Sequence, residues 1–112
     1  MGYIMIAFGG SCGSLTRFWL GKQIKSKTWF PLATFIINIT GAFLLGIVSS
    51  SNISHNLMLL LADGFLGAYT TFSTFMFEGF TLFKGSKLKN ALIYIFSTVI
   101  IGIIGFYMGS II

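Results

Sequence analysis

Hydroxyl and aromatic side chains gather in one short segment, residues 64–75, inside a stretch that is otherwise apolar. Hydroxyl groups at the depth of a bilayer need partners, and a run of them predicts a polar path. Phe72 and Phe75 are spaced three residues apart and therefore share one helix face. Because the edge of an aromatic ring is positive, such a pair can replace part of the hydration shell of a small, hard anion. Packing is the alternative role for the rings, but the neighbouring hydroxyls favour an anion-facing wall. The hydroxyls belong to Thr70, Thr71, Ser73 and Thr74.

Two glycines, Gly64 and Gly67, precede this cluster. Glycine allows a helix to unwind. The carbonyl groups of an unwound segment inside a membrane must line a cavity or coordinate something. A monovalent cation held by carbonyl oxygens is one solution, and a threonine-stabilised kink without an ion is the other. The sequence therefore predicts a break in this helix next to the hydroxyl cluster.

Three further polar residues are candidates. Asn38 lies in the middle of an apolar stretch, where its amide either bonds a neighbouring helix or offers an N–H group to an anion. Beside the hydroxyl cluster we favour the anion. Glu78 has a structural role or couples transport to protons, and the structural role is favoured because no second acid accompanies it. Arg17 either steers anions or sets topology. No catalytic constellation is present, so the sequence does not indicate an enzyme.

The elements that must position these residues are membrane helices. The chain has 112 residues, of which 55% are hydrophobic and 8% are charged, whereas roughly a quarter of the residues in soluble domains are charged. A membrane-spanning helix needs about 20 apolar residues, so the chain holds about four. We expect an all-α membrane protein with one domain, residues 1–112, and a broken third helix. The expected helices are residues 3–20, 32–50, 57–83 and 90–112.

Lysines are confined to two of the three expected loops, and both loops lie on the same side of the membrane. They are Lys22, Lys25, Lys27, Lys84, Lys87 and Lys89. Positive loops face the cytoplasm, so both termini are expected outside. We attribute the net charge of +5 to lysines that set the orientation of the chain in the membrane, and not to nucleic-acid binding.

Small residues recur at helix-packing spacing. Gly9 and Gly13 form one GxxxG pattern, and Gly105 and Gly109 form another. Such patterns let two backbones approach closely. Packing within one chain and an interface between chains are equally good explanations.

The chain resembles the bacterial fluoride channels, a family called Fluc or CrcB, over nearly its whole length. Three segments carry the resemblance: GGSCGSLTRF at 9–18, NITGAFLLG at 38–46 and GFLGAYTTFSTFMFE at 64–78. The resemblance implies an antiparallel dimer with two narrow fluoride pores. It implies a structural sodium ion, not transported, that is held at the dimer centre by the backbone carbonyls of Gly67 and Thr70. Arg17 and Glu78 match family positions without a fixed role. The implied anion-contacting residues are Asn38, Phe72, Ser73, Thr74, Phe75, Tyr94 and Thr98.

The expected function is passive fluoride efflux across the cell membrane, which lowers cytoplasmic fluoride and its toxicity. A proton-coupled drug or cation exporter of four helices is the alternative, although its first helix would need an acid that residues 3–20 lack. A non-conducting partner subunit is a third interpretation. The one-sided lysines predict a fixed orientation and pairing with an oppositely oriented paralogue, with a homodimer as the alternative.

Overall fold

In the computed structural model, which describes residues 2–25, 28–85 and 87–112, all regular structure is helical. This confirms the all-α prediction. Lys27, one of the six loop lysines, lies outside the described residues. The elements are α1 (Gly2–Gln23), α2 (Leu32–Ser50), α3 (His55–Met58), η1 (Leu59–Leu66), α4 (Gly67–Tyr69), α5 (Phe72–Lys84) and α6 (Leu88–Ser110).

The third helical passage is built from four pieces, α3, η1, α4 and α5. Ser54 caps its start by accepting a hydrogen bond from the N–H of Leu57. The segment η1 is a π-helix, a wider turn that is rare and is often found at functional sites. The chain then becomes extended at Thr70 and Thr71 before α5 begins. The third helix is therefore broken, as its composition predicts.

The position of the break corrects the sequence-based prediction. Gly67 has helical angles, φ −60° and ψ −37°, and Gly64 lies inside η1, so neither glycine unwinds. Gly64 is needed for close approach instead, because a methyl group there would lie 2.8 Å from the carbonyl oxygen of Ile6 in α1. Thr70 and Thr71 form the break themselves.

Among the described residues, three helical passages are long and apolar enough to cross a membrane: Leu32–Ser50, His55–Lys84 and Leu88–Ser110. The helix α1 is also long, at 22 residues, but its glycines, its serines and Arg17 dilute its apolar character. Thr70 lies near the midpoint of the 30-residue passage His55–Lys84. The break therefore falls close to the middle of this passage.

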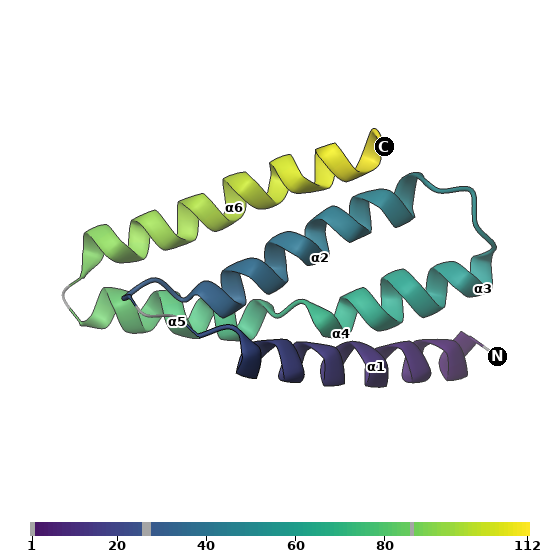
Figure 1. The fold of residues 1–112 in the computed structure, drawn as a ribbon, viewed down its shortest axis with the longest axis horizontal. Helices are drawn as coiled ribbons and strands as arrows, with labels where there is room; N and C mark the ends of the chain where they lie inside the picture. Colours follow the sequence, from purple (N-terminus) through teal and green to yellow (C-terminus); the bar gives the residue numbers. More distant parts are fainter. Residues whose placement is uncertain (1, 26–27, 86) are drawn as a thin grey trace.

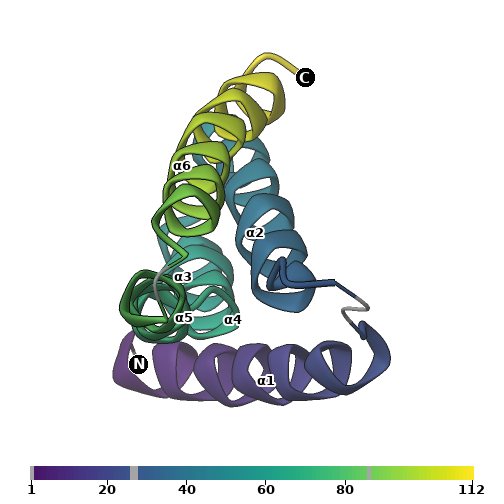
Figure 2. The same cartoon turned by 90° about the vertical axis from the view of Figure 1, so that its left-hand side faces the viewer.

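The helices pack as two pairs (Figures 1 and 2). The helix α6 lies along α2, and α1 lies against η1 and α4 on the opposite side of the molecule. A methyl group on Gly13 would overlap the carbonyl oxygen of Phe65, and one on Gly109 would overlap that of Phe43. Both GxxxG patterns thus serve packing within the chain.

The connections between the long helical passages lie at two opposite ends of the molecule. The α1–α2 and α5–α6 connections lie at one end of the molecule, while the α2–α3 connection and both termini lie at the other (Figure 1). The described loop lysines, Lys22, Lys25, Lys84, Lys87 and Lys89, are all exposed. One end of the molecule therefore carries the basic loops.

Candidate functional site

The break in the third helix is held open by Asn38 of α2. Its Oδ1 accepts a hydrogen bond from the N–H of Thr71 at 2.9 Å, and its Nδ2 donates to the carbonyl oxygen of Thr71 at 3.1 Å. Both backbone groups of a buried residue are thereby satisfied, which a membrane interior requires. An Asn amide has two N–H donors, so one hydrogen remains for a further acceptor. The structure thus gives Asn38 the interhelical role that sequence reasoning ranked second.

Hydroxyl groups complete the two ends of the break. Thr70 donates its hydroxyl to the carbonyl oxygen of Leu66 at 3.0 Å, which ends α4. The Oγ1 of Thr71 accepts from the N–H of Thr74 at 3.3 Å and caps α5. The hydroxyl of Tyr69 lies 2.9 Å from that of Thr40, which ties the end of α4 to α2. Thr71 and Tyr69 are structural partners that sequence reasoning missed, since neither contact is visible without the fold.

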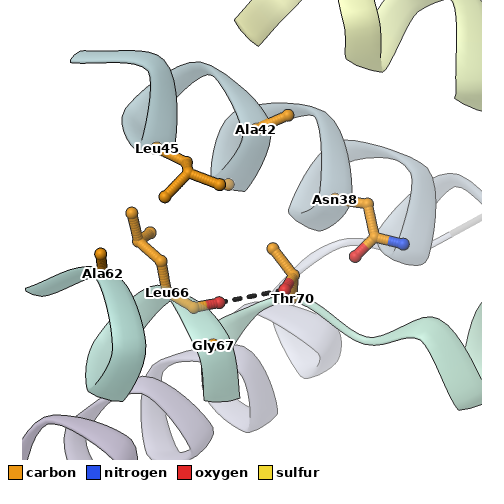
Figure 3. A pocket seen from close by; sticks show the side chains of 8 residues that line it. Asn38, Ala42, Leu45, Ala62, Leu66, Gly67 and Thr70 are labelled. Atoms are coloured by element: carbon orange, nitrogen blue, oxygen red, sulfur yellow. Dashed lines mark hydrogen bonds between the residues drawn. The ribbon is translucent and has the colours of Figure 1, made fainter. Parts of the chain in front are cut away.

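A cavity of about 250 Å³ lies between α2 and the break (Figure 3). Asn38, Ala42 and Leu45 of α2 line one side, and Gly67 and Thr70 lie across from them. Gly41 lines it as well, and a methyl group there would overlap the methyl of Thr70. The two residues expected to hold a cation therefore share one cavity.

The phenylalanine pair starts α5 immediately after the break. The ring centroids of Phe72 and Phe75 lie 6.3 Å apart, as expected for two residues on one helix face. Phe75 is buried and packs against Tyr94 of α6 at 5.2 Å. Phe72 is 73% exposed in the single chain, and Ser73 and Thr74 beside it are also exposed. The polar and aromatic start of α5 thus faces out of the chain.

Tyr94 and Thr98 of α6 lie inside the chain, with their hydroxyls engaged. Tyr94 is fully buried and donates to Oε1 of Glu78 at 3.2 Å, whereas Thr98 donates to the carbonyl oxygen of Tyr94 at 2.6 Å. The bond from Tyr94 favours a structural role for Glu78. The ring of Phe30, in the connection before α2, also contacts the ring of Tyr94, with the two centroids 5.4 Å apart.

The remaining candidate, Arg17, is half-buried in α1, the helix that packs on η1 and α4. Throughout the described part of the chain, every buried side-chain nitrogen or oxygen has a hydrogen-bond partner. The hydroxyls of Ser73 and Thr74 belong instead to exposed residues at the start of α5.

Fold and site together define a small, multi-pass helical membrane protein whose third helical passage is broken near its midpoint. Residues 4–110 match a family model described as "CrcB-like protein, Camphor Resistance (CrcB)". The chain belongs to the CrcB family.

Curated relatives are similar in sequence to this chain over almost its whole length. Fluoride-specific ion channel FluC 2 of Clostridium acetobutylicum is 62% identical, with 98% of this chain and 96% of the relative covered. FluC 1 of Ligilactobacillus salivarius is 51% identical over 96% and 95% of the two chains, and FluC 2 of Bacillus cereus is 45% identical over 95% and 92%. These relatives are named as ion channels, in keeping with the prediction that the chain is not an enzyme.

Proposed function

We propose that this chain forms a fluoride-selective channel that lets fluoride leave the cell passively. The observation that supports the proposal is the break at Thr70 and Thr71, which comes directly before the Phe72–Phe75 pair and lies near the midpoint of the passage His55–Lys84. The relatives named as fluoride-specific channels support the same substrate. At mildly acidic external pH, HF enters a cell and dissociates, so a conductive path lets the negative-inside potential drive fluoride out.

The pore is proposed to run past the start of α5, where the exposed Phe72 and the buried Phe75 lie next to each other. Ring edges of Phe72 and Phe75 contact the anion, the hydroxyls of Ser73 and Thr74 donate to it, and the second Nδ2 hydrogen of Asn38 adds a donor. Tyr94 and Thr98 support this wall from α6, with Tyr94 packed on Phe75. We assign Arg17 to topology or anion steering and Glu78 to the hydrogen bond with Tyr94.

A dimer of antiparallel chains is proposed because the polar start of α5 faces outward and needs a second wall. The carbonyl groups of Gly67 and Thr70 are suited to a sodium ion, because oxygen atoms are the ligands that hard cations prefer. In a continuous helix these two carbonyls would accept bonds from the N–H groups of Thr71 and Thr74, but those groups bond elsewhere. Two carbonyls are too few for a cation, and a second chain related by a two-fold axis supplies two more.

We further propose a fixed orientation, with the basic loops in the cytoplasm and both termini outside, in a dimer with an oppositely oriented paralogue. Four helical passages, α1 included, then cross the bilayer. The numbered names FluC 1 and FluC 2 among the relatives are consistent with paired chains. Tags on both termini, probed in cells that express this chain alone, test the orientation. Equal populations facing each way would favour the homodimer.

Fluoride release from liposomes tests the function directly. Liposomes are reconstituted with this chain alone or with its paralogue, and fluoride and chloride release are measured with electrodes. Release of fluoride without chloride, driven by a potassium gradient and valinomycin, is expected. Release that needs a proton gradient and is lost in Glu78→Gln would favour the coupled exporter. No release with the chain alone, and full release with the paralogue alone, would favour a non-conducting subunit.

Replacing Phe72 by isoleucine is expected to lower fluoride flux while leaving assembly intact. A ring contributes about 1–2 kcal/mol to an ion at its face, and a similar contribution at its edge corresponds to a roughly 5–30-fold lower flux. Phe77→Ile is the matched control, because Phe77 is similarly exposed, at 70% against 73%, on another face of α5. Flux in the liposome assay and elution volume in detergent are measured. Equal flux in Phe72→Ile and Phe77→Ile would remove Phe72 from the pore.

A further inference from the structure

The break diverts two backbone N–H groups away from the carbonyls that are proposed to hold the cation. In a continuous helix, the N–H of Thr71 would bond the carbonyl of Gly67, and the N–H of Thr74 would bond that of Thr70. The first N–H bonds Oδ1 of Asn38 at 2.9 Å instead, and the second bonds Oγ1 of Thr71 at 3.3 Å. The side chain of Asn38 thus removes the N–H group that would otherwise bond the carbonyl of Gly67. The side chain of Thr71 does the same for the carbonyl of Thr70.

We propose that Thr71 and Asn38 are positioning residues that set the affinity of the cation site by holding these two N–H groups. This proposal rests on the proposed cation site. Neither side chain contacts the cation. Each one keeps a carbonyl oxygen available that a closed helix would use for its own hydrogen bond.

The backbone N–H, the carbonyl and the hydroxyl oxygen of Thr71 all take part in the hydrogen bonds at the break. Its N–H and its carbonyl both bond Asn38, and its hydroxyl oxygen accepts from Thr74. Its backbone is extended, with φ −142° and ψ 113°, and the residue is only 7% exposed. Water is thus largely kept away from the backbone groups of Thr71, which find their partners in Asn38.

The neighbouring threonine has a different role. The hydroxyl of Thr70 donates to Leu66, and the N–H of Thr70 also bonds the carbonyl of Leu66. These bonds end α4 without using the carbonyl of Thr70. Thr70 and Gly67 both line the cavity. Removing the hydroxyl of Thr71 is therefore the change that returns the N–H of Thr74 to the carbonyl of Thr70.

The test is the sodium dependence of stability in Thr71→Val, which keeps the shape of threonine and lacks the acceptor. The channel, with its paralogue if the dimer needs it, is purified in detergent and melted at increasing sodium concentration, with N-methylglucamine keeping the ionic strength constant. The sodium concentration for half-maximal stabilisation should rise roughly five- to tenfold, the equivalent of one net hydrogen bond. Saturating sodium should restore the stabilisation.

Two controls separate positioning from general damage. Thr71→Ser keeps the cap and should titrate like the unmodified protein. Thr16→Val removes a hydroxyl of α1 that bonds the carbonyl of Cys12 within its own helix, and it should leave the sodium midpoint unchanged. If Thr71→Val does not fold, Thr71→Cys replaces it, since a thiol is a weak acceptor of nearly the same size as the serine hydroxyl.

The outcomes distinguish the positioning role of Thr71 from the proposed cation site on which it rests. An unmodified protein whose stability is indifferent to sodium would contradict the cation site itself. The unmodified protein could instead depend on sodium while Thr71→Val or Thr71→Cys keeps the same sodium midpoint as Thr71→Ser. This result would leave the cation site intact and overturn the positioning role of Thr71. A raised midpoint in the valine or cysteine variant, with serine and Thr16→Val unchanged, supports it.

Discussion

Replacing Asn38 by alanine is expected to abolish fluoride flux and to lower the stability of the protein strongly. The change removes both partners of the Thr71 backbone, at 2.9 Å and 3.1 Å, from a residue that is 7% exposed. A buried polar group left without a partner costs about 1–3 kcal/mol, so two such groups cost about 2–6 kcal/mol. The chain either loses its assembly or closes the helix at Thr71, and both results destroy the geometry at the start of α5.

The measurements are the melting temperature in detergent and fluoride release from liposomes. Asn52→Ala is the control, because Asn52 is an exposed asparagine in the connection between α2 and α3. That variant should match the unmodified protein in both assays. Asn38→Asp keeps an acceptor for the N–H of Thr71 and loses the donor to its carbonyl, so it should fall between the two. Unchanged flux and melting in Asn38→Ala would show that the break holds without Asn38.

Replacing Gly13 by alanine is expected to prevent α1 from docking on η1. The added methyl group would overlap the carbonyl oxygen of Phe65 and lie close to its Cα. Both obstacles are backbone atoms, which cannot move aside as the end of a long side chain does. Overpacking of this kind costs about 1–3 kcal/mol or more. The yield of folded protein and its melting temperature in detergent should both fall.

Gly21→Ala is the matched control within α1. Nothing lies within 4 Å of a methyl group at this position, and alanine is a better helix former than glycine by about 1 kcal/mol. This variant should be as stable as the unmodified protein or slightly more stable. If Gly13→Ala and Gly21→Ala behaved alike, close packing of α1 on η1 would not contribute to stability.

Features that depend on the average character of a long segment could be predicted from the sequence. The apolar stretches predict the helices, and the observed bounds, such as Leu32–Ser50, lie close to the expected ones. The glycines beside the hydroxyl cluster predict a break in the third helix, although they do not give its position. The spacing of Phe72 and Phe75 predicts their shared face, which the 6.3 Å ring distance confirms.

Features that depend on contacts between distant residues could not be predicted. Glycine is the residue that tolerates unwinding best, so the sequence points to Gly67, yet a break in a membrane forms where partners exist for the freed backbone. Those partners come from Asn38, 33 residues away from Thr71. The bond between Tyr94 and Glu78 likewise joins two helices, and nothing in the spacing of residues along the chain indicates it.

The dependence of the break on Asn38 has a consequence for how the protein is made. Before α2 docks, the backbone of Thr71 has no partner in the hydrocarbon, where each unsatisfied group costs several kcal/mol. We therefore expect residues 55–84 to enter the membrane as one unbroken helix and to open at Thr71 when Asn38 packs beside it. On this expectation, the last step in the biogenesis of the protein is a local loss of helix at Thr71.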